Sequence, residues 1–389
     1  MFMACLIVRD DAYPSVEGKP MKISAVKVAE LNVEMHHAIK TPIGDISAAR
    51  NVVVKIETDA GVFGWGETSP MAAITGDSQA SAYAMGLDMA KLLIGQDPLA
   101  IETNLRLLRR YCSQATSILC AFDIALYDLA AKQANMPLYQ FLGGSLRELE
   151  TDHTIGHQSS VLGTVARAKD LVKQGFNTIK LKTGRPGQED IEHIEAVRAA
   201  VGETVKLRID CNQGWDYPTA VANIRLLKEL NIEYVEQPLA AWDVDGFARL
   251  RANSALPICA DESVFTHVDA LRLVKADAVD FLNIKLVKSG GINTALKISS
   301  IAEAAGIRCM IGCFGESRLG LSAAAHLASA YPNIHFIDLD SALHFCHDPV
   351  TGGIEIIENS GGKMIIPAGI GHGAELDEAE LDHITCITA

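Results

Sequence analysis

The sequence predicts an α/β barrel joined to a smaller α+β domain, and three observations support this prediction. The chain of 389 residues exceeds one average domain, yet α/β barrels run long, so we expect two structural units. After Thr151, short β-rich runs alternate with amphipathic helical stretches about every 25 residues, the spacing of βα units in a parallel barrel. Polar residues end almost every run, as in a barrel whose active site gathers them at one rim. A doubly wound open sheet is the structural alternative.

The two ends of the chain differ from this central repeat. Residues 21–68 alternate apolar and polar residues between turn signals, which predicts an antiparallel meander, and residues 78–142 have a helical period. A Gly-rich, strand-like segment near the C-terminus is expected to pack back on the first domain. We therefore expect an N-terminal extension at residues 1–20, an α+β domain at 21–145 together with 345–389, and the barrel at 146–344.

Composition narrows the function classes. Hydrophobic residues make up 49% of the chain and charged residues 21%, as in a compact soluble protein. The formal net charge of −14 argues against a nucleic-acid partner and against an anionic membrane surface, because phosphate groups would be repelled. The nine cysteines form no C-x-x-C pair, and the chain has neither a recognisable signal segment nor a transmembrane run. We expect a cytoplasmic protein with reduced thiols.

Three acids end three successive predicted strands. Asp210, Glu236 and Asp261 offer oxygen ligands, the kind that Mg²⁺ prefers, with Mn²⁺ as the alternative ion. Any one of them alone would more simply be a capping or surface acid. Because barrel strand ends converge, three in register favour a metal site.

Three lysines accompany these acids. Lys180 and Lys182 are separated by one residue on a strand, so both point into the barrel, where their charges should lower the pKa of at least one. A solvated Lys-x-Lys pair is the alternative, but Ile179 and Leu181 suit a face covered by helices. Lys285 follows the sixth strand, across the barrel from the second. A carbon acid between Lys182 and Lys285 would lose a proton on one face and regain it on the other, which predicts racemisation or epimerisation.

The motifs also carry a family resemblance. TIKLK, RIDCNQGW, VEQPL, ADES, NIKLVKSGG and GESRLG, in this order and spacing, resemble the muconate-lactonizing subgroup of the enolase superfamily, and PLYQFLGG is similar to that family's link between cap and barrel. The resemblance covers nearly everything after Met21. It implies a modified TIM barrel, (β/α)7β, capped by an α+β domain made from both chain ends, and a homo-oligomer. It also implies residue roles: Mg²⁺ ligands at Asp210, Glu236 and Asp261, acid/base groups at Lys182 and Lys285, and binding of the substrate carboxylate by Lys180.

The eighth strand distinguishes activities within this subgroup. Asp338-Leu339-Asp340 resembles the Asp-x-Asp signature of the dipeptide epimerases, where two carboxylates hold the substrate's α-ammonium, although one acid capping a loop is the alternative. We therefore expect a Mg²⁺-dependent isomerase that inverts the C-terminal α-carbon of an L,L-dipeptide by 1,1-proton transfer through an ene-diolate. N-acylamino acid racemase, o-succinylbenzoate synthase and muconate cycloisomerase-like activities are the alternatives. A catalytically silent binding protein is a different class.

Four further residues have weaker signals. Thr154 on the first strand and Cys313 on the seventh are candidate substrate contacts, with core packing as the alternative. Glu316 resembles a family acid near the metal that does not bind it. His326 in SAAAHLA is expected to be a helix histidine with a structural partner.

The segment from His36 to Asp45 resembles the family's loop over the substrate. It contains no arginine, and Lys40 is its only lysine. An L-Ala-D/L-Glu preference is therefore in doubt, and a small or hydrophobic dipeptide is an equal expectation.

Overall fold

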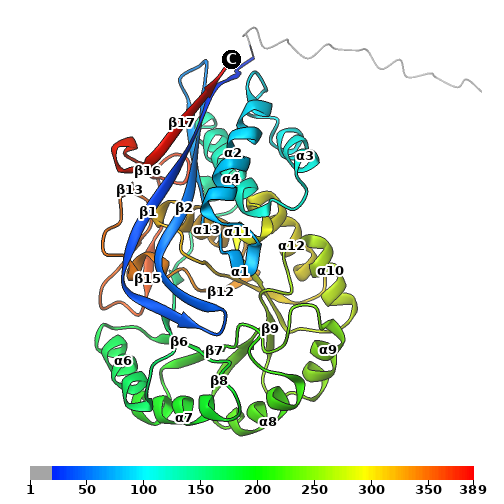
Figure 1. Ribbon diagram of the computed structural model, residues 1–389, viewed down its shortest axis with the longest axis vertical. Helices are drawn as coiled ribbons and strands as arrows, with labels where there is room; N and C mark the ends of the chain where they lie inside the picture. The colour runs from blue at the N-terminus through cyan, green and yellow to red at the C-terminus, as the bar shows by residue number, and fades with distance from the viewer. Residues whose placement is uncertain (1–19) are drawn as a thin grey trace, which may run out of the picture.

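The computed structural model describes residues 20–389, so the predicted extension falls almost entirely outside the described residues. The chain forms a cap and a barrel stacked along the long axis (Figure 1). Between residues 20 and 389, no helix is both long and apolar enough to cross a membrane.

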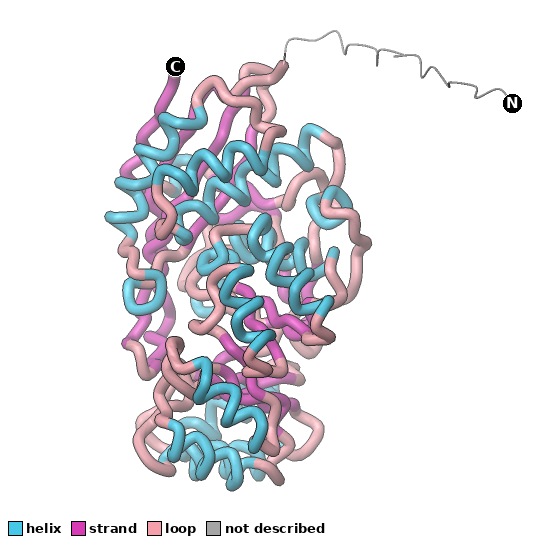
Figure 2. Tube along the Cα trace, turned by 90° about the vertical axis from the view of Figure 1, so that its right-hand side faces the viewer, coloured by secondary structure: helices cyan, strands magenta, loops and turns pink. Residues whose placement is uncertain are grey.

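The cap begins with the predicted antiparallel meander. Two long strands, β1 (Ile23–Thr41) and β2 (Gly44–Thr58), form a hairpin that runs from the cap down over the barrel, and β3 (Phe63–Thr68) pairs with β2. The last strand, β17 (Asp382–Thr388), pairs with β1 from the other side, so the end of the C-terminal tail joins the cap sheet. The Gly-rich segment, which was expected to pack on the first domain, instead places Ile354, Met364 and Ile366 in the barrel core. Helices α2 (Gln79–Leu93) and α4 (Thr116–Gln133) pack against this sheet, and α3 (Ile101–Tyr111) packs against both helices. The cap also contains two short helices, α1 (Ala72–Thr75) and α5 (Leu138–Phe141). Figure 2 shows the cap helices and strands together at one end of the molecule.

Helix α4 is the central element between cap and barrel. Every residue from 117 to 131 is buried, as expected for a helix that is packed on all sides. Gly64 and Gly66 on β3 make this packing possible, because a Cβ atom on either would lie within 2.1 Å of a backbone oxygen of α4. On its other side, Asp123 of α4 accepts the N–H groups of Ile292 and Asn293 at the start of a barrel helix. Helix α4 thus helps to fix the cap to the barrel.

The barrel confirms the predicted repeat. Eight parallel strands follow one another in sequence order and are connected by seven helices, and within residues 20–389 no α-helix follows the last of these strands: the (β/α)7β pattern. The strands are β5 (His153–Ile155), β6 (Thr178–Lys182), β7 (Lys206–Asp210), β8 (Ile232–Glu236), β9 (Ile258–Ala260), β10 (Phe281–Ile284), β11 (Arg308–Ile311) and β12 (Ile334–Ile337). The helices are α6 (Val161–Lys173), α7 (Glu189–Val201), α8 (Tyr217–Leu227), α9 (Val244–Asn253), α10 (His267–Lys275), α12 (Ile292–Ala304) and α13 (Arg318–Ala330), with the short α11 (Leu286–Ser289) after β10.

The first and last strands meet, which excludes the open-sheet alternative. The N–H of Asp152 donates to the carbonyl of Ile337 at 3.4 Å, and the N–H of Leu339 donates to the hydroxyl of Thr151 at 2.8 Å. The turn after β12 is the 3-10 helix η1 (Ser341–His344). The remaining tail forms β13 (Val350–Gly352), β14 (Glu355–Ile356), β15 (Lys363–Ile365), β16 (Ala374–Leu376) and η2 (Glu378–Glu380); β15 pairs with β4 (Leu149–Glu150) just before the barrel.

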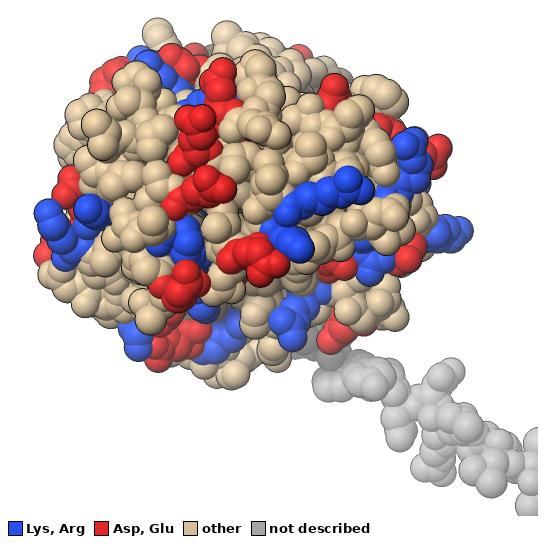
Figure 3. All heavy atoms as spheres, turned by 90° about the horizontal axis from the view of Figure 1, so that it is seen from below, with Lys and Arg blue, Asp and Glu red and all other residues tan. Residues whose placement is uncertain are grey.

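The surface carries mixed charge. Seen from the barrel end, acidic and basic side chains are interspersed among neutral ones (Figure 3). This face offers no continuous basic surface of the kind that phosphate polymers require.

His326 on α13 is the structural histidine that the sequence predicts. Its ring is buried and stacked on Tyr139, with ring centroids 5.5 Å apart, and its Nδ1 accepts the N–H of Tyr139 at 3.0 Å. Burial, with a smaller contribution from His372, lowers the pKa of His326 to about 3.

This depressed pKa gives the stability of the fold a pH dependence. The unfolded state binds a proton below its ordinary pKa of about 6.5, whereas the folded state stays neutral, so stability present above that pH is lost as the pH falls. Between pH 7 and 5 the contribution of His326 amounts to at most about 2 kcal/mol. We expect His326→Gln to lose less free energy of unfolding over this window than the parent, measured by urea denaturation. Equal pH dependence in His326→Gln and the parent would contradict this account.

Candidate active site

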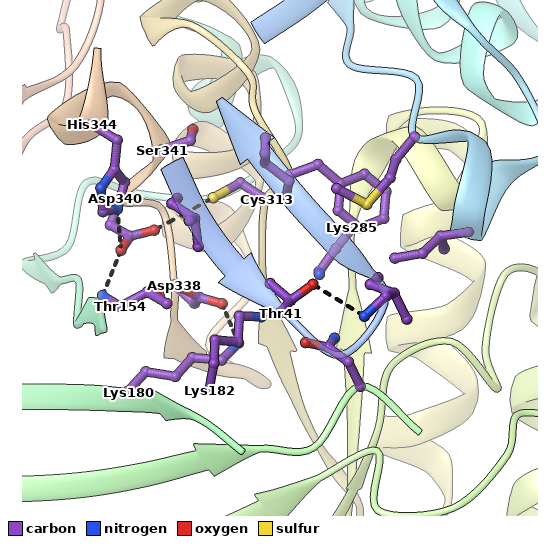
Figure 4. A pocket seen from close by; sticks show the side chains of 17 residues that line it. Thr41, Thr154, Lys180, Lys182, Lys285, Cys313, Asp338, Asp340, Ser341 and His344 are labelled. Atoms are coloured by element: carbon purple, nitrogen blue, oxygen red, sulfur yellow. Dashed lines mark hydrogen bonds and ion pairs between the residues drawn. The ribbon is translucent and has the colours of Figure 1, made fainter. Parts of the chain in front are cut away.

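The predicted site residues come together at the carboxyl ends of the barrel strands. A pocket lies there beneath the tip of the β1–β2 hairpin, which contributes Ile39, Thr41, Ile43 and Ile46 (Figure 4). Its barrel side is lined by Thr154, Lys180, Lys182, Asn212, Lys285, Cys313, Asp338, Asp340, Ser341 and His344. Asp210, Glu236 and Asp261 lie below these side chains and are completely buried.

Lys180 is the centre of the charge network. Its ammonium nitrogen lies 2.7 Å from Asp338, 2.8 Å from Glu236 and 3.2 Å from Asp210. Burial favours the neutral amine, but these three carboxylates outweigh it and hold the pKa of Lys180 well above its usual range. The pKa of Lys180 is therefore raised, not lowered, by its surroundings.

Lys182 and Lys285 face the pocket from opposite strands. β6 and β10 are four strands apart in the eight-stranded barrel. The Nζ atom of Lys182 lies 2.6 Å from Asp210, and that of Lys285 lies 2.9 Å from Asp261 and 4.4 Å from the centre of the Phe314 ring. A substrate carbon in this pocket would have one lysine on each side.

Negative charge is in excess at this rim. Six carboxylates (Asp210, Glu236, Asp261, Glu262, Asp338 and Asp340) face four lysine ammonium groups (Lys180, Lys182, Lys285 and Lys288), so two negative charges are unbalanced when all are ionised.

Two carboxyl groups at this rim have raised pKa values. Burial and the charge of Asp210 raise the pKa of Glu236 to about 7, and burial and the charge of Asp261 raise that of Glu262 to about 8. By contrast, Lys182 and Lys180 overcome burial and lower the pKa of Asp210 to about 2.

The three buried acids fit a divalent cation by their chemistry. They offer oxygen ligands only, and two positive charges would balance the rim. Oε2 of Glu236 and both side-chain oxygens of Asp261 contact only lysine ammonium groups, as ion pairs. The described side chains whose ligand atoms already lie within 4.8 Å of one another are two other groups: His153, Asp340 and His344, and Cys313, Asp338 and Asp340. Each of the three buried acids forms an ion pair with a lysine ammonium group.

Asp338 and Asp340 form the other end of the pocket. Their oxygens lie within 4.8 Å of each other and of the Cys313 sulfur. Oδ2 of Asp340 accepts the backbone N–H of Thr154 at 2.7 Å and lies 3.4 Å from Nε2 of His344. Although burial acts against it, these contacts hold the pKa of Asp340 below its usual range. The two acids therefore make a compact anionic site, and Thr154 orients Asp340 through its backbone.

Glu316 does not line this pocket. Its carboxylate accepts the N–H of Phe314 at 2.6 Å, and its backbone carbonyl accepts the hydroxyl of Ser341. Burial raises the pKa of Glu316 to about 7. Its observed contacts shape the turn after β11.

Two family models match this chain. One, described as enolase C-terminal domain-like, matches residues 163–380, and the other, the N-terminal domain of mandelate racemase and muconate lactonizing enzyme, matches residues 23–143. The chain belongs to the mandelate racemase/muconate lactonizing enzyme family of the enolase superfamily.

Characterised members of the family are similar over most of their length. A hydrophobic dipeptide epimerase of Enterococcus faecalis is 40% identical over 86% of this chain and 95% of its own. The crystal structure of a Cytophaga hutchinsonii dipeptide epimerase complexed with Mg and D-Ala-L-Val has a TM-score of 0.92 at 38% identity, covering 94% of this chain and all of that one. An N-succinyl-L-Arg/Lys racemase of Bacillus cereus is 33% identical over 84% of this chain and 89% of its own.

The sequence analysis did not identify the buried residues that fix Asp261 and its loop in place. Lys288, on α11, is completely buried; its ammonium donates to the carbonyls of Asp261, Val264 and Asn283 and lies 2.5 Å from Oδ1 of Asp261. Gln237 accepts the N–H of Asp261 at 2.8 Å and so fixes the same loop. Lys285 and Lys288 are three residues apart, about one helical turn, and this spacing could have indicated that Lys288 lies near the site. Nothing in the sequence indicated a role for Gln237.

The position of Lys288 leads to a stability prediction. Lys288→Met leaves the Asp261 carboxylate and three carbonyls without their buried donor, and breaking such a pair costs about 3–5 kcal/mol. We expect this loss in the free energy of unfolding, measured by urea denaturation. Lys275→Met, which removes an exposed lysine from α10, should change it by less than about 0.5 kcal/mol. Equal effects of the two substitutions would contradict the structural role of Lys288.

Proposed function

We propose that this protein is a Mg²⁺-dependent dipeptide epimerase that inverts the α-carbon of the C-terminal residue of an L,L-dipeptide. One observation carries the proposal: the paired carboxylates of Asp338 and Asp340 line the same pocket as two lysines from opposite strands. The carboxylates fit the α-ammonium group that a dipeptide has and an N-acylamino acid lacks.

Asp210, Glu236 and Asp261 would hold the metal. When bound, Mg²⁺ would stabilise the negative charge that develops on the substrate carboxylate as the α-proton leaves. Lys180 already lies among Asp210, Glu236 and Asp338, so its ammonium is placed to assist in binding that carboxylate.

The proton transfer itself belongs to Lys182 and Lys285. One lysine, as the neutral amine, removes the α-proton and becomes an ammonium group, breaking the C–H bond on its face. The other, as the ammonium group, forms a new C–H bond on the opposite face and becomes the amine. No oxidant or reductant is required, and the reverse reaction exchanges the two roles.

The pocket wall supports an apolar second residue. Beside the lysines it is lined by Ile43, Ile46, Met71, Ile74 and Phe314, with no acid or base among them. This agrees with the doubt about an L-Ala-D/L-Glu preference, because no arginine lines this part of the pocket. The activity named for the Enterococcus relative and the D-Ala-L-Val bound by the Cytophaga relative point in the same direction.

An Asp340→Asn variant tests the ammonium site. The substitution removes one charge with little change in shape, and loss of a buried charge partner costs about 2–5 kcal/mol. We expect at least about 30-fold lower kcat/KM for deuterium exchange at the C-terminal α-carbon of L,L-dipeptides, measured by proton NMR in D₂O with Mg²⁺. Asp245→Asn, at an exposed position on α9, should match the parent.

The same assay includes N-succinyl and N-acetyl amino acids as alternative substrates. Exchange of these compounds alone by the parent enzyme would replace the epimerase proposal with the racemase alternative. Normal turnover of dipeptides by Asp340→Asn would show that the eighth strand does not bind the ammonium group.

A further inference from the structure

A second cavity adjoins the pocket at its ammonium end. It measures about 270 Å³ and lies between the hairpin tip, the loop after β5 and helix α6. Five basic residues line it: His37 and Lys40 from the hairpin, His157 from the loop, Arg167 from α6 and His344 from η1. We call it the basic cavity. None of its lining residues is an aspartate or glutamate.

The strongest cations of the basic cavity have no acidic partner. Arg167 is half-buried, and among residues 20–389 no carboxylate lies within ion-pair distance of it; its one polar contact is with Nε2 of His153 at 3.4 Å. Lys40 likewise forms no ion pair within the described part of the chain. Arg185 by contrast pairs with Asp190, and Arg147 and Arg198, which have no carboxylate partner among the described residues either, donate to backbone carbonyls. An unpaired guanidinium facing a cavity indicates an anionic ligand.

The location of the basic cavity identifies which part of a dipeptide reaches it. Three residues line both the pocket and the basic cavity: Ile39, Thr154 and His344. Two of them contact Asp340, through the Thr154 N–H and the His344 ring. Lys182 and Lys285, which would flank the reacting carbon, do not line the basic cavity. The cavity is therefore next to the first residue of a bound dipeptide and away from the second.

We propose that the basic cavity binds the carboxylate side chain of the substrate's N-terminal residue. This inference rests on the proposed dipeptide epimerase function and specifies its substrate as a dipeptide with aspartate or glutamate first and an apolar residue second. Arg167 pairs with the side-chain carboxylate, Lys40 adds positive charge from the hairpin, and Asp338 with Asp340 holds the ammonium group of the same residue. The side-chain carboxylate of the N-terminal residue thus lies against positive charge, and its ammonium group lies against negative charge.

Isosteric dipeptides test this assignment. The rate of deuterium exchange at the C-terminal α-carbon is measured for L-Glu-L-Leu, L-Gln-L-Leu and L-Leu-L-Leu with the Mg²⁺-loaded enzyme. Since glutamate and glutamine differ mainly in charge, a charge-assisted pair should give L-Glu-L-Leu roughly tenfold higher kcat/KM than L-Gln-L-Leu. The difference should appear in KM, because the contact is remote from the reacting carbon.

Variants of α6 locate the effect. Arg167→Gln should remove the preference for glutamate over glutamine, while Arg167→Lys should keep part of this preference. Lys169→Gln removes the same charge from an exposed position on the same helix and should keep the full preference.

The outcomes separate the two proposals. Equal exchange of L-Glu-L-Leu and L-Gln-L-Leu, or a preference that survives Arg167→Gln, overturns the basic cavity as a carboxylate site while the epimerase proposal stands. A clear preference for L-Leu-L-Leu would assign the cavity to an apolar side chain instead. Failure of all three peptides to exchange overturns the epimerase proposal and this inference with it.

Discussion

The rest of this structure depends on one constraint: lysine and carboxylate side chains are buried together at one end of the barrel. Isolated buried charges are very costly, so each must have a partner of opposite sign or a bound ion. Here Lys180 contacts carboxylates from three different strands, and Lys288 holds the loop that carries Asp261. Carboxyl groups outnumber ammonium groups at this rim, which suits a site for a divalent cation and a zwitterionic substrate.

The cap is attached so that its hairpin covers this rim. Helix α4 is buried between the cap sheet and the barrel, and Asp123 caps the start of α12 just beyond Lys285 and Lys288. Glu67 on β3 similarly accepts the N–H groups of Ser317 and Gly320 at the start of α13. These two buried acids connect the sheet that carries the hairpin to the elements that carry the charged site. These contacts therefore fix the position of the hairpin, with its specificity residues, relative to the acid/base residues on the barrel.

The sequence was most informative about structure where a residue pattern has a single physical explanation. Alternation of short apolar runs with polar ends predicted the barrel strands within a few residues, because strand ends in a closed barrel converge. The same rule placed Lys180, Lys182, Lys285, Asp338 and Asp340 around one pocket. It could not predict contacts between side chains. The pairing of Lys180 with three acids, which raises the pKa of Lys180, was not expected, and the sequence of α6 does not distinguish Arg167 from a surface residue. Such features depend on which elements become neighbours, and a single sequence does not contain that distance information.

The most direct test of two lysines acting on opposite faces is α-proton exchange in D₂O by Lys182→Met and Lys285→Met. With one lysine left, an enzyme can still remove and return the proton on one face but cannot deliver it to the other. Neither variant should invert a dipeptide, and each should exchange the α-proton of one epimer with retention, the two variants acting on opposite epimers. Inversion by either variant, or exchange of the same epimer by both, would contradict the account.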